Sequence, residues 1–221
     1  MAAFSAAGVW QLGRQAEKQA MLDAVADTLA RRTPRALALA ADPRRARDYD
    51  WARGEGRFID APAILLDNQQ REGRSGVRAY RVFDPGSAPL LLVELGWLPL
   101  PGDRTLPDVP RPWGRIDVQG LLAPPPSSGI ATAVAVTQPD GSVLTIGLDA
   151  ANLAASVGVA ALAPRVLKLD PALPIGHARD LDVLPNTLPP ARHLGYAVQW
   201  FALALAVLVT ALVLTFRPRR R

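Results

Sequence analysis

The chain has no cysteine and only two histidines, His177 and His193. Without cysteine it forms no disulfide, no thiolate metal centre and no thiol redox site. A metal site usually needs three or four clustered ligands, and a serine nucleophile needs a nearby base, which two separated histidines do not supply. A phosphate-binding loop is missing as well, because Gly54-Glu55-Gly56 lacks a third glycine and does not open a helix. We therefore expect that the protein is not an enzyme.

Lysine is also scarce, since Lys18 and Lys168 are the only lysines and the other basic residues are arginines. The formal net charge is +5, and subtracting the four arginines that follow residue 216 leaves +1. A nucleic-acid-binding surface needs a larger excess of positive charge. We expect no nucleic-acid partner, and the C-terminal arginines indicate a membrane boundary instead.

The longest stretch without charge lies near the C-terminus, where no Asp, Glu, Lys or Arg stands between Arg192 and Arg217. Its 24 residues form a helix of about 36 Å, enough to cross a hydrocarbon core of about 30 Å. Tyr196 and Trp200 stand near its first end, and a basic cluster of this kind stays on the cytoplasmic side. We predict a transmembrane helix over 193–216, a cytoplasmic basic tail over 217–221, and a periplasmic domain over 13–190.

The first twelve residues are uncharged and mostly apolar, but too few to span a bilayer. No basic region of a signal peptide precedes them. Either they cap a soluble helix, or 1–12 is part of a first transmembrane helix whose true start lies upstream. The apolar spacing after them predicts a helix over 14–32, which Pro34 ends.

Short runs rich in Val, Ile, Leu and aromatics fill the middle of the chain, each bounded by turn residues. They predict strands at 53–60, 63–68, 78–83, 90–97, 115–122, 131–137, 142–148 and 165–169. This pattern is typical of an α+β fold with a β-rich antiparallel sheet or a partly open barrel and helices at its edge. The domain is flanked by an apparently truncated N-terminal transmembrane helix and a C-terminal one.

Turn and helix signals separate these strands. Asp67-Asn68 with Gly73 predicts one hairpin connection, and Gln138-Pro139-Asp140-Gly141 predicts a turn between two later strands. A helix is expected from Asp149, as its N-cap, to Gly158 as its C-cap. Five prolines between residues 171 and 190 predict a stiff, extended tether to the membrane.

The start of the C-terminal helix carries the one candidate binding face. His193, Tyr196, Ala197 and Trp200 follow at i, i+3, i+4 and i+7, and hence on one side of a helix. An axial nitrogen, a small residue and two aromatic rings suit a haem, with His193 on the iron. The alternative is that histidine and aromatics simply populate the interfacial belt of a membrane helix.

These residues carry a resemblance to the Surfeit-locus protein one family. The segment 193–204 (HLGYAVQWFALA) resembles its second-helix motif, and further matches run in order along the chain: 8–12 with Arg14 and Lys18, 65–68 with Gly73, 91–93 with Gly96-Trp97 and Pro99, Val118 with Gly120 and Pro124, and 166–170 with Arg179-Asp180. Two positions depart from the family pattern. Gln69 replaces an arginine, and Glu94-Leu95 replaces Asn-Arg, so positive charge is lost there.

The resemblance implies an assembly factor for haem–copper cytochrome c oxidase in the bacterial inner membrane. Such a factor assists insertion of haem a into the catalytic subunit, with His193 at the position of the family's haem-linked histidine. The implied partners are that subunit, the haem a synthesis machinery and the lipid bilayer. Two alternatives remain, namely a scaffold that binds no haem and a permanent accessory subunit of the oxidase.

Overall fold

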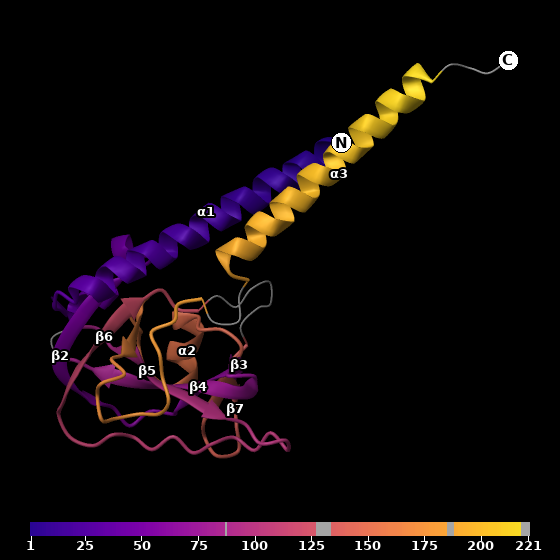
Figure 1. Cartoon of the computed structure of the whole chain (residues 1–221). Helices are drawn as coiled ribbons and strands as arrows, with labels where there is room; N and C mark the ends of the chain where they lie inside the picture. Colours follow the sequence, from indigo (N-terminus) through magenta and orange to yellow (C-terminus); the bar gives the residue numbers. More distant parts are fainter. Residues whose placement is uncertain (87, 127–133, 185–187, 218–221) are drawn as a thin grey trace. The chain divides into compact units, whose positions relative to one another are not determined.

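The computed structural model describes residues 1–86, 88–126, 134–184 and 188–217 (Figure 1). The chain divides into two units, one made of residues 1–24 with 187–221 and the other of residues 25–186. The helical elements are α1 (Ala2–Arg31), η1 (Leu37–Ala41), η2 (Pro43–Arg45), α2 (Ala150–Ser156) and α3 (Pro190–Phe216). The strands are β1 (Arg35–Ala36), β2 (Asp50–Phe58), β3 (Ile64–Arg71), β4 (Arg74–Asp84), β5 (Leu91–Pro99), β6 (Ile116–Ala123), β7 (Val136–Thr137), β8 (Val143–Thr145) and β9 (Val166–Leu169).

The expected α+β class is confirmed, but the sheet is not purely antiparallel and not a closed barrel. The strands follow the order β1-β2-β6-β9-β5-β4-β3-β8-β7, with a short additional pairing of β2 to β4. Three pairs are parallel, namely β1–β2, β3–β8 and β5–β9. Consecutive strands joined by tight turns must be antiparallel, whereas the long stretches of chain that separate β3 from β8 and β5 from β9 leave room for the crossovers that parallel pairs need.

The predicted strands lie close to the observed ones, and the differences are local. The first three residues of the strand expected over 131–137 lie outside the described residues, and its end forms β7. The hairpin of β3 and β4 turns at Glu72 and Gly73, with φ of 52° and 74°, as a two-residue turn requires. Asp67-Asn68 is therefore not the connection: Asn68 instead forms a bulge within β3, at φ 58°.

The sheet is buried on both faces, which explains the almost unbroken apolar run of β5. One face holds the larger core, including Phe83, Val93 and Leu122. Leu153 and Ala154 of α2 pack on the other face, against side chains of β3, β4, β5 and β9. Thus α2 covers a face of the sheet rather than its edge. The carboxylate of Asp149 caps this helix as expected, accepting a hydrogen bond from the Asn152 amide at 2.9 Å.

The segment after β9 is not a free tether over its first half. The His177 amide donates to the Leu95 carbonyl at 2.7 Å, and the Trp97 amide donates to the Ala178 carbonyl at 2.7 Å. The Arg179 guanidinium donates to four carbonyl oxygens of the same segment, at Asp170, Leu173, Ile175 and His177. Proline removes backbone donors and favours extended backbone, and here neighbouring residues supply the docking contacts that composition alone does not reveal.

In the first unit the N-terminal part of α1 and α3 run antiparallel and side by side (Figure 1). Phe4 stacks on Trp200, Gln11 contacts His193, and Lys18 contacts Leu188, so contact positions ascend in one helix as they descend in the other. Among the described residues, α3 is the helix long and apolar enough to cross a membrane. By the same measure α1 does not qualify; residues 2–12 form the first part of this 30-residue helix, and a transmembrane helix that includes them stays a prediction.

Candidate functional site

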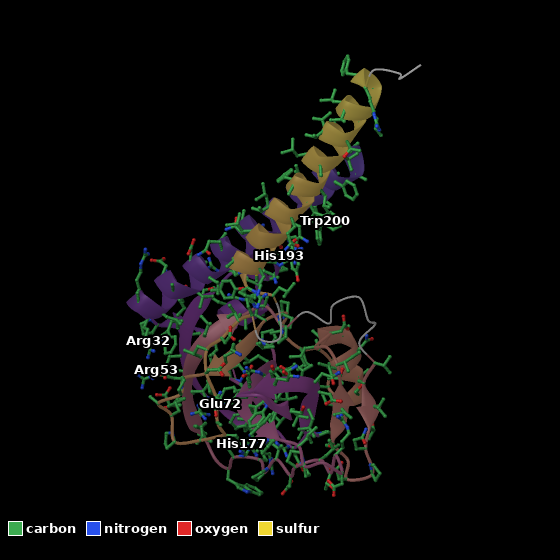
Figure 2. The ribbon with its side chains drawn as sticks, turned by 45° about the vertical axis from the view of Figure 1, so that its right-hand side comes forward. Arg32, Arg53, Glu72, His177, His193 and Trp200 are labelled. Atoms are coloured by element: carbon green, nitrogen blue, oxygen red, sulfur yellow. The ribbon has the colours of Figure 1, made fainter. Side chains whose placement is uncertain are left out.

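His193 lies in the first turn of α3 and is turned inward, with 6% of its surface exposed (Figure 2). Its Nδ1 lies 2.7 Å from Oε1 of Gln11, which comes from α1. Because an amide oxygen only accepts hydrogen bonds, this contact is a hydrogen bond when Nδ1 carries the imidazole proton. The tautomer of a histidine is commonly fixed in this way by a partner on its second nitrogen.

The other ring nitrogen of His193, Nε2, is buried and has no hydrogen-bond partner. With the proton on Nδ1, this atom carries the lone pair that a metal would take. Buried polar atoms are nearly always paired, so an orphaned one calls for an explanation. Its chemistry fits one axial nitrogen ligand for an iron.

Of the four residues predicted to share one face of the helix, three contact the neighbouring helix α1 and one does not. Ala197 is 1% exposed and lies with His193 in the contact with α1. Trp200 stacks on Phe4 with ring centroids 5.8 Å apart and planes inclined by 20°. Tyr196 is 39% exposed and lies outside this contact. The space beside the small side chain of Ala197, which was expected to suit a haem, is therefore filled by α1.

Sequence reasoning missed the α1 residues that complete this site. Lys18 is 7% exposed, and its ammonium donates to the Leu188 carbonyl at 2.6 Å. Phe4, Gln11 and Lys18 are spaced seven residues apart, which places them on one side of α1. His193, Ala197 and Trp200 have the matching spacing on α3. This heptad pattern was the available signal for a paired helix.

Comparison with protein families decides what kind of chain this is. Residues 1–205 match the SURF1 family. The chain belongs to the SURF1 family. The resemblance drawn from the ordered motifs is thus confirmed, and this family is linked to the assembly of cytochrome oxidase. A search of curated proteins finds no match.

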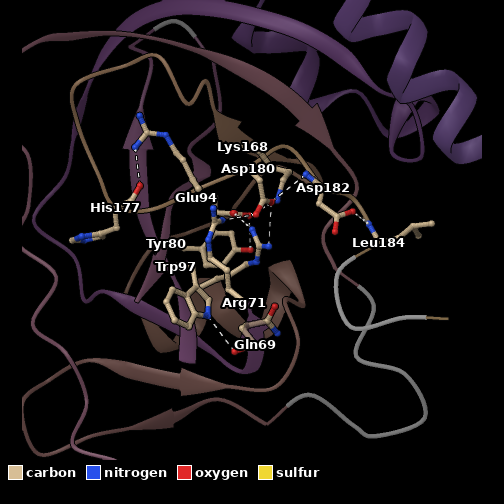
Figure 3. Close-up of polar contacts among 12 residues, drawn as sticks. Gln69, Arg71, Tyr80, Glu94, Trp97, Lys168, His177, Asp180, Asp182 and Leu184 are labelled. Carbon is tan, nitrogen blue, oxygen red and sulfur yellow. Dashed lines mark hydrogen bonds and ion pairs between the residues drawn. The ribbon is translucent and has the colours of Figure 1, made fainter. Parts of the chain in front are cut away.

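The two positions at which this SURF1 chain departs from the family pattern are both interior. Glu94 is 1% exposed and accepts hydrogen bonds from Arg78, from Tyr80 and from Lys168, the last at 2.8 Å (Figure 3). Gln69 is 9% exposed, and its backbone carbonyl accepts a hydrogen bond from the indole of Trp97 at 3.1 Å. These changes therefore alter the core of the domain rather than an outer surface.

His177 belongs to the second unit and lies beside Arg179 in the segment that docks on β5. Burial, together with the positive charge of Arg179, lowers the pKa of its imidazole. Across the described part of the chain, no group of three or more His, Cys, Asp or Glu side chains is placed to hold a metal ion. His193 thus stands apart as a single potential ligand.

Proposed function

We propose that this SURF1 chain is a membrane-anchored assembly factor for haem–copper cytochrome c oxidase that assists insertion of haem a into the catalytic subunit. Haem a is its transient cargo, and the chain performs no catalysis of its own. The observation that carries the proposal is the buried, unpaired Nε2 of His193. Family membership supports the oxidase connection, and the length and hydropathy of α3 support the anchor.

Three neighbours would hold the cargo at His193. Gln11 keeps the ligating nitrogen unprotonated through its contact with Nδ1. Trp200 and Tyr196 offer aromatic surface to a macrocycle, worth about 0.5–1.5 kcal/mol for each aromatic contact. Because α1 fills the gap at Ala197, the ring has to occupy the rim of the helix pair or separate the two helices locally.

The proposed setting is the bacterial inner membrane, with residues 25–186 on the periplasmic side. The arginines after residue 216 stay in the cytoplasm and fix this orientation. The proposed partners are the oxidase catalytic subunit, the haem a synthesis machinery and the lipid bilayer. Haem held at the start of α3 would be transferred sideways near the membrane surface without crossing water.

A second candidate is a scaffold that holds the oxidase core subunit and binds no haem. The observation in its favour is the close fit of α1 on the predicted haem face, where Ala197 is 1% exposed. A permanent accessory subunit would share this geometry, but it would remain in the mature oxidase.

The deciding experiment measures haem a in protein purified from cells that make haem a. We expect His193→Ala to lose most of its haem while still folding and inserting into the membrane. His177→Ala is the matched control and should keep its haem, because His177 has no part in the helix pair. Full haem content with an unchanged Soret band in His193→Ala would reject the ligand assignment and favour the scaffold.

A further inference from the structure

The second unit carries a groove that the haem site does not use. It lies where β2 ends and β6 begins, and has a volume of about 290 Å³. Three arginines line it, Arg57, Arg111 and Arg115, together with the buried Phe58 and the exposed Trp113. Cationic and aromatic side chains converge here on one small surface.

Trp113 is 80% exposed, and the guanidinium of Arg111 lies over its ring at 4.4 Å. Burying so large an apolar ring is favourable, and this free energy is not gained while the ring is exposed to water. Tryptophan and arginine are also the side chains most enriched among residues that dominate binding at protein interfaces. The exposed ring is therefore suited to contact another molecule.

The loop that carries Trp113 is anchored to the domain. Val109 is 2% exposed and belongs to the main core. Arg81 donates to the Val109 carbonyl at 3.1 Å and to the Ala61 carbonyl at 2.8 Å. A preordered loop loses less conformational entropy when a partner binds, so this anchoring favours recognition.

The groove arginines are held only loosely by carboxylates of the same chain. Arg57 approaches Asp84 at 3.4 Å, Arg115 approaches Glu55 at 3.6 Å, and Arg111 approaches Asp60 at 3.9 Å. Three other arginines of the unit, Arg45, Arg71 and Arg104, each have an aspartate at 2.6–2.7 Å. Among the described residues, no acidic side chain lines the groove itself. Its guanidinium groups are thus available to an external anion.

The groove lies at the far end of β2 and β6 from the points where the chain leaves this unit. Val25 and Val183 pack with Leu121 and Ala123 at the end of β6, whereas Ile116, at its start, pairs with Gly56 beside the groove. Eight residues at about 3.3 Å each separate these ends by roughly 25 Å. Within this unit the groove is therefore clear of both chain connections.

We propose that this groove docks an acidic segment of a partner protein. Carboxylates of that segment bind Arg57, Arg111 and Arg115, and an apolar side chain packs on the exposed ring of Trp113. The contact gives the SURF1 chain a protein partner through a surface that contains none of the proposed haem-binding residues.

The test uses the full-length protein in nanodiscs and a short labelled peptide of glutamate and phenylalanine, with a glutamine-for-glutamate peptide as the charge control. Fluorescence anisotropy gives the affinity. We expect Arg57→Glu with Arg115→Glu, and separately Trp113→Ala, to weaken binding about tenfold or more. Arg44→Glu with Arg47→Glu is the matched control, because it reverses two exposed arginines near the start of β2 and should change affinity less than about twofold.

Several results would overturn the proposal. They are absence of binding to the glutamate peptide, equal binding of the glutamine peptide, and equal loss in both double variants. Nanodiscs that contain brominated anionic lipid provide the last arm. Trp200 on α3 is quenched in every variant, so the comparison concerns the additional quenching that Trp113 contributes. If Trp113→Phe removes such a contribution, the groove binds lipid headgroups and the proposed protein segment is rejected. Haem content is measured in parallel, and it should stay at the wild-type level in every groove variant.

Discussion

The side-chain amide of Gln11 accepts the hydrogen bond from Nδ1 of His193 and so leaves the lone pair of Nε2 available to a metal. Gln11→Leu removes the acceptor for Nδ1–H and should release the imidazole to either tautomer or ring orientation. We expect haem occupancy to fall by about tenfold, in line with the effect of losing a partner that orients a metal ligand. Gln11→Glu keeps an acceptor and should retain more haem than Gln11→Leu. If both variants show wild-type occupancy and spectra, Gln11 does not position the ligand.

Glu94 is a buried charge in the second unit that accepts hydrogen bonds from two buried cations and a tyrosine. Glu94→Gln keeps the side-chain volume but leaves the cations of Lys168 and Arg78 buried without their carboxylate. Breaking a buried ion pair from one side typically costs about 3–5 kcal/mol of folding free energy. Chemical denaturation should show this loss. Glu72→Gln is the control: its side chain is 81% exposed and 3.7 Å from Arg71, so a change below about 1 kcal/mol is expected.

We also expect Glu94→Gln to change how the free energy of unfolding depends on pH. Burial raises the pKa of Glu94, but Lys168 and Arg78 outweigh it, so the pKa lies below its ordinary value. The unfolded state then binds the proton first, and the stabilisation is complete above about pH 4.5 and falls as the pH drops through the folded-state pKa. Asp50 and Asp180, whose pKa values are also lowered, titrate in both proteins. Wild type should therefore lose more stability than Glu94→Gln on acidification, and parallel curves would contradict this.

The pairing of β6 with β9 depends on one position without a side chain. A Cβ atom at Gly120 would lie 2.0 Å from the Lys168 carbonyl oxygen, so the strands would have to separate. Gly120→Ala should lower the free energy of unfolding by at least about 1–3 kcal/mol. Gly102→Ala is matched in chemistry and has no atom within 4 Å of the new methyl group. Its stability in thermal denaturation should be nearly unchanged, and equal melting temperatures for both variants would refute the packing argument.

The strands themselves could be predicted from sequence because each has its own apolar run and turn residues. Their partners could not, since β9 lies between β5 and β6 through contacts of residues far apart in the chain. The two-residue strand β1 has no sequence signal, because Arg35 and Ala36 are extended only by pairing with β2. Asn68 predicts a turn because asparagine tolerates positive φ. The bulge that it forms instead uses the same backbone conformation, so the sequence does not distinguish the two.

Part of the candidate site could likewise be predicted from sequence, because that part depends on spacing within one helix. Spacing along one helix placed His193 and Ala197 on a common side, but it gave no information on what covers that side. The covering helix was seen as two pieces, because Arg14, Glu17 and Lys18 interrupt its apolar start. The role of Gln11 emerges only when residues 182 positions apart meet.

At the scale of the whole molecule, the proposed orientation depends on the unequal charge at the two ends of α3. One arginine, Arg192, precedes the apolar stretch, whereas four follow residue 216. The more basic flank stays in the cytoplasm. A chain without cysteine allows this to be tested with single introduced thiols, because no native thiol reacts.

We expect a membrane-impermeant maleimide to label Glu72→Cys in cells whose outer membrane is permeabilised, since that side chain is 81% exposed. A cysteine added after Arg221 should react only once the inner membrane is disrupted. Replacing the four C-terminal arginines by asparagine removes the charge difference and should yield a mixed population in which both thiols react in part. Labelling of the C-terminal thiol in intact spheroplasts, with Glu72→Cys protected, would reverse the topology and place the domain that carries the Arg57–Trp113 groove in the cytoplasm.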